Sequence, residues 1–131
     1  MNSTGNFTEL VLNGNVTLTG GTLTLSNNSQ NYIFGQVSTD TLTNEETIQG
    51  AGQIGHGQMQ LINTGTINSN SSAGMTIAAN QGITNTGTME ATNGSTLLLS
   101  GSDIINNTGG TISANTGIIN LTSKMCIRDS L

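Results

Sequence analysis

Three stretches of the sequence decide the fold: Asn63-Thr64-Gly65-Thr66-Ile67, Asn85-Thr86-Gly87-Thr88-Met89 and Asn107-Thr108-Gly109-Gly110-Thr111-Ile112. Their leading asparagines stand at positions 63, 85 and 107, so the two intervals between them are equal. A more divergent copy, Asn44-Glu45-Glu46-Thr47-Ile48, precedes Asn63 by a slightly shorter interval. A repeat of about 20 residues that keeps the same positions is typical of a solenoid, in which each repeat forms one coil and packs on its neighbours.

Apolar residues recur at fixed places in each copy of the repeat. One aliphatic residue stands two positions before the asparagine, and an isoleucine or methionine follows the asparagine by four or five positions. Equivalent residues of stacked coils lie above one another, so we expect core columns inside the stack. The first column holds Leu42, Leu61, Ile83 and Ile105, the second holds Ile48, Ile67, Met89 and Ile112, and a third set is Leu97, Leu99, Ile119 and Leu121.

Within a copy, apolar and polar residues alternate, as in Thr88-Met89-Glu90-Ala91. A period of two is typical of short strands with one buried face. Gly, Asn and Ser interrupt these runs too often for helices to form. Three short strands and three corners account for each copy, so the sequence predicts an all-β fold, a parallel β-helix (solenoid) with about 19–23 residues per coil.

The asparagine that opens each copy is polar in an otherwise apolar setting. In a stack of coils these side chains lie one above another, and an amide can donate to the next coil and accept from the previous one. We therefore expect an amide ladder at one corner, formed by Asn44, Asn63, Asn85 and Asn107.

The first third of the chain fits the repeat less closely. Apolar residues alternate in three short runs, which Asn13-Gly14 and Gly20-Gly21 separate. Asn-Gly between alternating runs is also a strong hairpin signal. We expect irregular coils over residues 1–41 and regular repeats over residues 42–123, and an antiparallel hairpin at the start is the alternative.

Residues 124–131 differ from everything before them. They contain the only cysteine, Cys126, and both basic residues, Lys124 and Arg128. The string Met-Cys-Ile-Arg-Asp-Ser within them resembles the translation of a transposase adaptor used in DNA-library preparation. We expect a non-native tail, and a natural charged cap is the alternative. Residues 1–123 then have no thiol, so we expect neither a disulfide nor a thiolate metal site.

The charge distribution excludes two classes of partner. Residues 1–123 contain no lysine or arginine, and the whole chain has a net charge of −5. Without basic residues the body cannot neutralise phosphates, so we expect neither nucleic-acid binding nor attachment to an anionic membrane. No apolar run reaches the ~20 residues of a membrane-spanning helix, so we expect no membrane insertion by this segment. The chain starts without an export signal, which indicates either a cytosolic protein or a missing N-terminal segment.

A family resemblance rests on the run Leu12–Leu25, the segment Ile48–Gly55 and the Asn-Thr-Gly-Thr-Ile copies. These resemble the passenger repeats of bacterial surface exoproteins, the filamentous-haemagglutinin-like and autotransporter adhesins. The resemblance covers about residues 8–123 and implies a right-handed β-helix, a location outside the cell or on the outer-membrane surface, and a role in adhesion or surface structure. The chain departs from the family in lacking an export signal, which we expect on a longer parent protein.

The residues that carry chemistry are few and scattered. Enzymatic β-helices need paired carboxylates, a metal or a basic residue, whereas the body has no lysine or arginine and only one histidine. Adjacent Glu45 and Glu46 point to opposite faces of a strand, and we expect them, Glu90 and Asp103 to be solvated charges. His56, between two glycines, is expected to be an exposed turn residue. We expect no enzyme, no cofactor and no metal site.

Two alternative functions remain open at this point. One alternative is ice binding. The chain contains Thr-x-Thr pairs such as Thr64 and Thr66, and stacked pairs of this kind order water on the flat faces of β-helical ice-binding proteins. A carbohydrate groove would need clustered exposed aromatic rings, for which the sequence offers only Tyr32 and Phe34 side by side.

We therefore expect a non-enzymatic structural or adhesive segment of about five to six coils. Its partners would be neighbouring repeats of a longer parent chain and ligands on host or cell surfaces. Both ends of the stack are expected to expose strand edges, because no capping coil is visible in the sequence.

Overall fold

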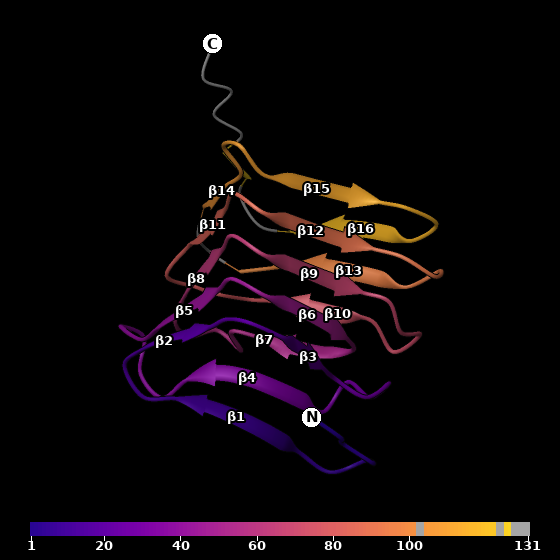
Figure 1. Ribbon diagram of the computed structural model, residues 1–131, viewed down its shortest axis with the longest axis horizontal. Helices are drawn as coiled ribbons and strands as arrows, with labels where there is room; N and C mark the ends of the chain where they lie inside the picture. Colours follow the sequence, from indigo (N-terminus) through magenta and orange to yellow (C-terminus); the bar gives the residue numbers. More distant parts are fainter. Residues whose placement is uncertain (102–103, 123–124, 127–131) are drawn as a thin grey trace.

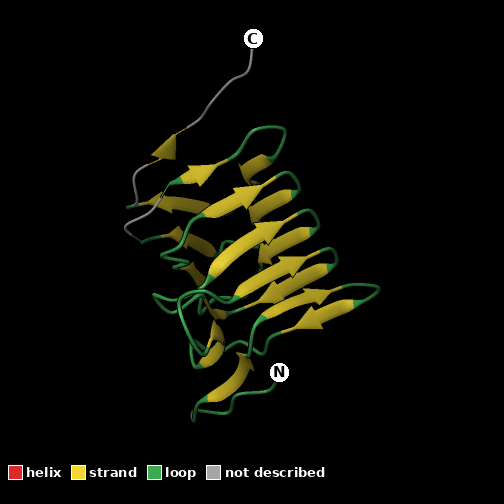
Figure 2. Ribbon diagram, turned by 90° about the vertical axis from the view of Figure 1, so that its left-hand side faces the viewer, coloured by secondary structure: helices red, strands yellow, loops and turns green. Residues whose placement is uncertain are grey.

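The fold is a right-handed parallel β-helix, seen in a computed structural model that describes residues 1–101, 104–122 and 125–126. The chain makes about five turns of about 22 residues, and every strand pairing in the described part is parallel. Figure 1 shows the coils rising from the N-terminus to the C-terminus. Figure 2 shows strands of neighbouring coils side by side with loops at the corners. The fold class predicted from the sequence is confirmed.

Three sheets form the walls of the helix, and each coil contributes one strand to each wall. Sheet A contains β1 (Thr8–Leu12), β4 (Asn31–Gly35), β7 (Gly52–Ile54), β10 (Met75–Ile77), β13 (Thr96–Leu99) and β16 (Ile118–Leu121). Sheet B contains β2 (Asn15–Leu18), β5 (Thr41–Asn44), β8 (Gln60–Asn63), β11 (Ile83–Asn85), β14 (Ile105–Asn106) and β17 (Met125–Cys126). Sheet C contains β3 (Thr22–Thr24), β6 (Thr47–Gly50), β9 (Thr66–Ser69), β12 (Thr88–Ala91) and β15 (Thr111–Ala114).

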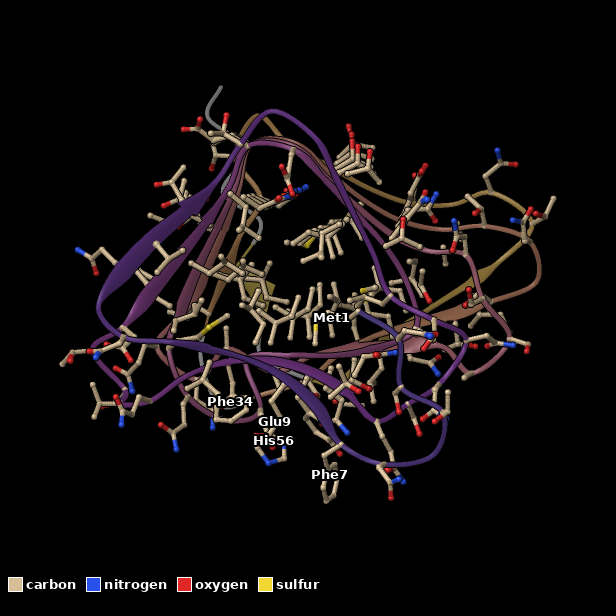
Figure 3. All side chains as sticks on the ribbon, turned by 60° about the horizontal axis from the view of Figure 1, so that its bottom comes forward. Met1, Phe7, Glu9, Phe34 and His56 are labelled. Carbon is tan, nitrogen blue, oxygen red and sulfur yellow. The ribbon has the colours of Figure 1, made fainter. Side chains whose placement is uncertain are left out.

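Alternating side chains explain why these short segments are strands. In β5, β6, β8, β9, β12 and β13, partly exposed and buried residues alternate along the strand, so one face of each points inward. Parallel pairing keeps equivalent residues in register, and the inward faces of the three sheets meet in one narrow apolar interior, visible in Figure 3. Burying each such side chain contributes about 1.5–3 kcal/mol.

The structure places the predicted core residues in register across neighbouring coils. Leu42 pairs with Leu61, Leu61 with Ile83, and Ile83 with Ile105 in sheet B. The residues of the second column pair in the same way in sheet C, and those of the third set pair in sheet A. The fully buried members are Leu42, Ile48, Leu61, Ile67, Met89, Leu97 and Leu99, and Ile83 and Ile105 are nearly so.

Three residues predicted to be core differ from the others. Ile112 and Ile119 are only partly buried, and Leu121 is 43% exposed. All three lie in the last described strands of their sheets, β15 and β16, which have a neighbouring strand on one side only. Columns pack from above and below, so a residue in a coil with a single neighbour loses half of its cover.

The N-terminal third also forms a coil, and the hairpin alternative is wrong. β1, β2 and β3 pair in parallel with β4, β5 and β6 rather than with one another. The coil is longer here, because Thr8 pairs with Asn31, Asn15 with Thr41 and Thr22 with Thr47. Each of these offsets is longer than the interval between the asparagines of the regular repeats, and the last two exceed the predicted range.

The extra residues of the longer coil lie in a turn at 36–40 that Asp40 holds in place. Its carboxylate accepts hydrogen bonds from the backbone N–H groups of Gly14 (2.9 Å) and Val37 (2.9 Å). Asp40 is 3% exposed, so this carboxylate is part of the interior. Bonds from two N–H groups compensate a buried carboxylate for its lost water.

The N-terminal end of the stack carries a partial cover. The terminal amino group of Met1 donates to Thr24 O (2.6 Å), and Ser26 N donates to Met1 O (3.0 Å). The Met1 side chain packs against the core, and Figure 3 shows this residue over the middle of the coil. Met1 covers part of the interior at this end, while β1, β2 and β3 remain the end strands of their sheets.

Part of the tail predicted to be non-native continues sheet B. β17 pairs in parallel with β14, with Ile105 opposite Met125 and Asn106 opposite Cys126. The other residues of 124–131 lie outside the described part of the chain.

The contrast between the middle and the end of the second column is testable. We expect Ile67→Ala to lower the free energy of unfolding by about 2–5 kcal/mol, because it opens a cavity at a fully buried site. Ile112→Ala should cost less than about 1.5 kcal/mol, because Ile112 is already partly exposed. Urea denaturation followed by circular dichroism measures both, and equal losses would contradict the column assignment.

Candidate functional site

The four asparagines predicted to form a ladder are joined by side-chain hydrogen bonds along the helix axis. Asn44 Nδ2 donates to Asn63 Oδ1 (2.8 Å), Asn63 Nδ2 to Asn85 Oδ1 (2.7 Å), and Asn85 Nδ2 to Asn107 Oδ1 (2.7 Å). The first three side chains are completely buried. The ladder begins in the second coil, since the equivalent residue of the first coil is Leu18.

Each amide in the middle of the ladder also closes the corner between sheets B and C. Asn63 Nδ2 donates to Gly65 O in its own coil and to Thr88 O in the next, and Asn85 repeats this with Gly87 O and Thr111 O. The corner has no room for a side chain on its inner side. A Cβ at Gly87 would collide with the backbone oxygen of Gly65, so the glycine is required by close approach of the coils. The amides of Asn44, Asn63 and Asn85 are buried and bonded within the stack, so the ladder is structural.

The structure describes three of the four predicted surface carboxylates. Glu90 lies between the buried residues Met89 and Ala91, so its side chain is on the outward face of β12. Glu45 and Glu46 lie at the corner before β6, where they border an open hollow of about 290 Å³ with Gly20, Gly21 and Gly65. Asp103 lies outside the described residues. Among the described residues no group of three or more His, Cys, Asp or Glu side chains is arranged to hold a metal ion.

The threonines of sheet C form a column on its outer surface. Thr22, Thr47, Thr66, Thr88 and Thr111 are in register on five neighbouring strands. The next outward column is mixed, with Thr24, Gln49, Asn68, Glu90 and Ser113. Thr64 and Thr86 lie in bends outside the strands. Sheet C therefore has one threonine column, whereas a flat array of Thr-x-Thr pairs needs two side by side.

The outer surface of sheet A carries a cluster of rings at the N-terminal end of the stack. Phe7, Tyr32, Phe34 and His56 contact one another in a chain, and with Glu9 they line a hollow of about 350 Å³. We call these five residues the aromatic hollow. Figure 3 shows Phe7, Glu9, Phe34 and His56 together on the same outer side of the coil.

The register of sheet A brings the hollow together from three coils. Glu9 of β1 pairs with Tyr32 of β4, and Tyr32 pairs with Gln53 of β7. All three point outward, because their strand neighbours Leu10, Ile33 and Ile54 point into the core. Neighbouring strands lie about 4.8 Å apart, which brings side chains that are distant in sequence into contact.

His56 joins the cluster through a strained turn. It follows β7 between Gly55 and Gly57 and has a φ of 45°, in the left-handed region that residues other than glycine seldom adopt. This turn directs the imidazole back over sheet A, with ring centroids 5.0 Å from Tyr32 and 5.9 Å from Phe34. The histidine is exposed, as the sequence predicted, but it is part of a cluster.

Gln53 fixes two of the rings with its amide. Its Nε2 donates to Tyr32 Oη (3.2 Å), and its Oε1 lies 3.3 Å from His56 Nδ1. In this orientation the amide oxygen accepts from Nδ1 when that nitrogen carries the proton. The Tyr32 hydroxyl accepts from Gln53 and keeps its own proton for another partner.

The cluster corrects one inference from the sequence. Tyr32 and Phe34 were expected to be the only clustered rings, yet Phe7 and His56 complete a group of four. Phe7 precedes Tyr32 by little more than the local coil length, which the pairing of Thr8 with Asn31 sets. This spacing indicates that Phe7 and Tyr32 lie near each other on neighbouring coils. It could not be used at the sequence level, because the first coil lacks the Asn-Thr-Gly motif that sets the register elsewhere.

The chain matches no protein-family model, and no curated protein or solved structure is significantly similar to it. Within the described residues, no helix is long and apolar enough to span a membrane.

The ladder geometry predicts a strong effect from a one-atom change. Asn63→Asp places an oxygen where the amide nitrogen donates to Asn85, Gly65 and Thr88, so we expect a loss of at least about 3 kcal/mol in the free energy of unfolding. Asn106→Asp is the matched control. Asn106 is exposed and its Oδ1 accepts from Thr108 N, which a carboxylate preserves, so the loss should stay within about 0.5 kcal/mol. Chemical denaturation of both variants measures the difference, and equal stability would contradict a structural ladder.

Proposed function

We propose that the chain is a non-enzymatic structural and adhesive segment of a secreted or surface-exposed exoprotein. The observation that carries the proposal is the uninterrupted stacking of coils, held by the amide ladder and by parallel pairing in all three walls. Within the described residues, each strand pairs with its sequence equivalents in adjacent coils. Such a stack extends by adding coils and keeps its cross-section, which suits a rod that holds a binding surface away from its anchor.

The outer surface supports a role in presentation. Thr, Asn, Gln and Glu side chains occupy the outward positions of sheet C, while the interior is apolar. The body has no cysteine before position 126 and a strong excess of acidic residues, as expected of a soluble chain that needs no disulfide to fold. Partners of the proposed segment are adjoining repeats of a parent chain and ligands on host or cell surfaces.

Adhesion is measured directly with chain-coated beads. Beads carrying the folded chain should stay on host or bacterial cell layers under flow several-fold longer than beads carrying Asn63→Asp, which differs by one side chain but is expected to lose the stacked outer surface as its ladder is disrupted. Albumin-coated beads give the background. Retention equal to that background on every surface tried would contradict the adhesive role.

Location is a separate test of the same proposal. An antibody against the chain should detect the parent protein in the medium or on the outer surface of cells that carry its gene. Detection only in the soluble fraction after lysis would overturn the proposed location.

A further inference from the structure

We infer that the aromatic hollow of Phe7, Glu9, Tyr32, Phe34 and His56 is a binding site for a small quaternary ammonium group of the choline type. This goes beyond the proposed structural role and does not depend on it. The site gathers every phenylalanine and tyrosine of the chain and its only histidine.

The rings are steeply inclined to one another and do not form one flat surface. The planes of Phe7 and Tyr32 meet at 66°, those of Tyr32 and His56 at 84°, and those of Phe34 and His56 at 56°. Rings so steeply inclined surround a compact group from several sides. A sugar ring stacks on one flat exposed aromatic face, whereas a tetrahedral ammonium group contacts several walls at once, and cations are attracted to aromatic faces within about 6 Å of the ring centre.

Charge selects a cation over a neutral molecule of the same shape. Glu9 lines the hollow, and residues 1–123 contain no lysine or arginine that would neutralise it. A carboxylate beside aromatic faces favours a ligand that is positive and weakly hydrated, and a quaternary ammonium is both.

The hollow is available and held open. Phe7 is 68% exposed, and Glu9 and His56 are exposed as well. Gln53 holds Tyr32 and His56 in place from outside the hollow's lining, which reduces the ordering that a ligand would have to impose. The volume of about 350 Å³ is within the range of small-molecule sites.

The test uses the intact chain and its own fluorescence. Tyr32 is the only tyrosine and the chain has no tryptophan, so tyrosine emission reports on this site alone. Choline chloride is titrated at constant ionic strength against its uncharged isostere 3,3-dimethylbutan-1-ol and against methyl β-glucoside. We expect a saturable response to choline in the millimolar range, and a response to the isostere that is at least about tenfold weaker.

Two pairs of variants assign the binding to the hollow. Glu9→Gln should weaken choline binding about tenfold, while Glu90→Gln, the same charge change on sheet C, should leave it unchanged. Phe7→Ala should weaken it several-fold, while Val37→Ala, at an exposed apolar residue outside the hollow, should not. Circular dichroism checks that each variant keeps its fold.

Four results would overturn the inference. Equal binding of choline and its uncharged isostere would identify an apolar hollow without charge selection. Saturation by methyl β-glucoside below the choline concentration would identify a saccharide site. The absence of any saturable response, or equal effects of Glu9→Gln and Glu90→Gln, would remove the site altogether.

A second experiment distinguishes a lipid headgroup from a free small molecule as the source of the ammonium group. Co-sedimentation with phosphatidylcholine vesicles that free choline reverses would identify a lipid headgroup. A Tyr32 response to choline without co-sedimentation would identify a free small molecule. Both results support the same chemistry at the hollow.

Discussion

The buried amide of Asn63 imposes the constraint on which the rest of the fold depends. It accepts from the coil before it and donates to the coil after it, and it closes its own corner as well. A buried amide left without these partners would cost more than the ladder contributes, so each coil must repeat the same register as its neighbours. The apolar columns then follow, because register alone places Ile48, Ile67 and Met89 above one another.

Close stacking at the ladder corner determines which small residues are tolerated there. Gly65 and Gly87 lie where the preceding coil approaches most closely. The second coil instead has Glu46 at this position, over the hollow beside Gly20 and Gly21. The inward positions that end the sheet C strands hold Gly50, Ser69 and Ala91 for the same reason, since little space remains between the walls. The small residues therefore recur in the sequence wherever the same narrow places recur in successive coils.

This repetition explains what the sequence could and could not predict. The fold class and the buried columns follow from positions that recur at nearly equal intervals along the chain. The turn at 36–40 does not recur, and its buried Asp40 resembles an ordinary surface charge until Gly14 and Val37 are seen to donate to it. The exposure of Leu121 depends on the lack of a second neighbouring coil in the described part, which no local pattern records.

The aromatic hollow was hidden for the opposite reason, since it breaks the repeat. Interior positions are under the same constraint in every coil, whereas an outward position is constrained only by solvent and by whatever binds there. On sheet A the outward column changes from Glu9, Tyr32 and Gln53 to Thr76 in β10, so the rings are confined to one end of the wall. The histidine and the three further rings on the outer surface of sheet A are not part of the core that stacks the coils. A group of exposed rings that adds nothing to the stacking of the coils supports the proposed ligand site.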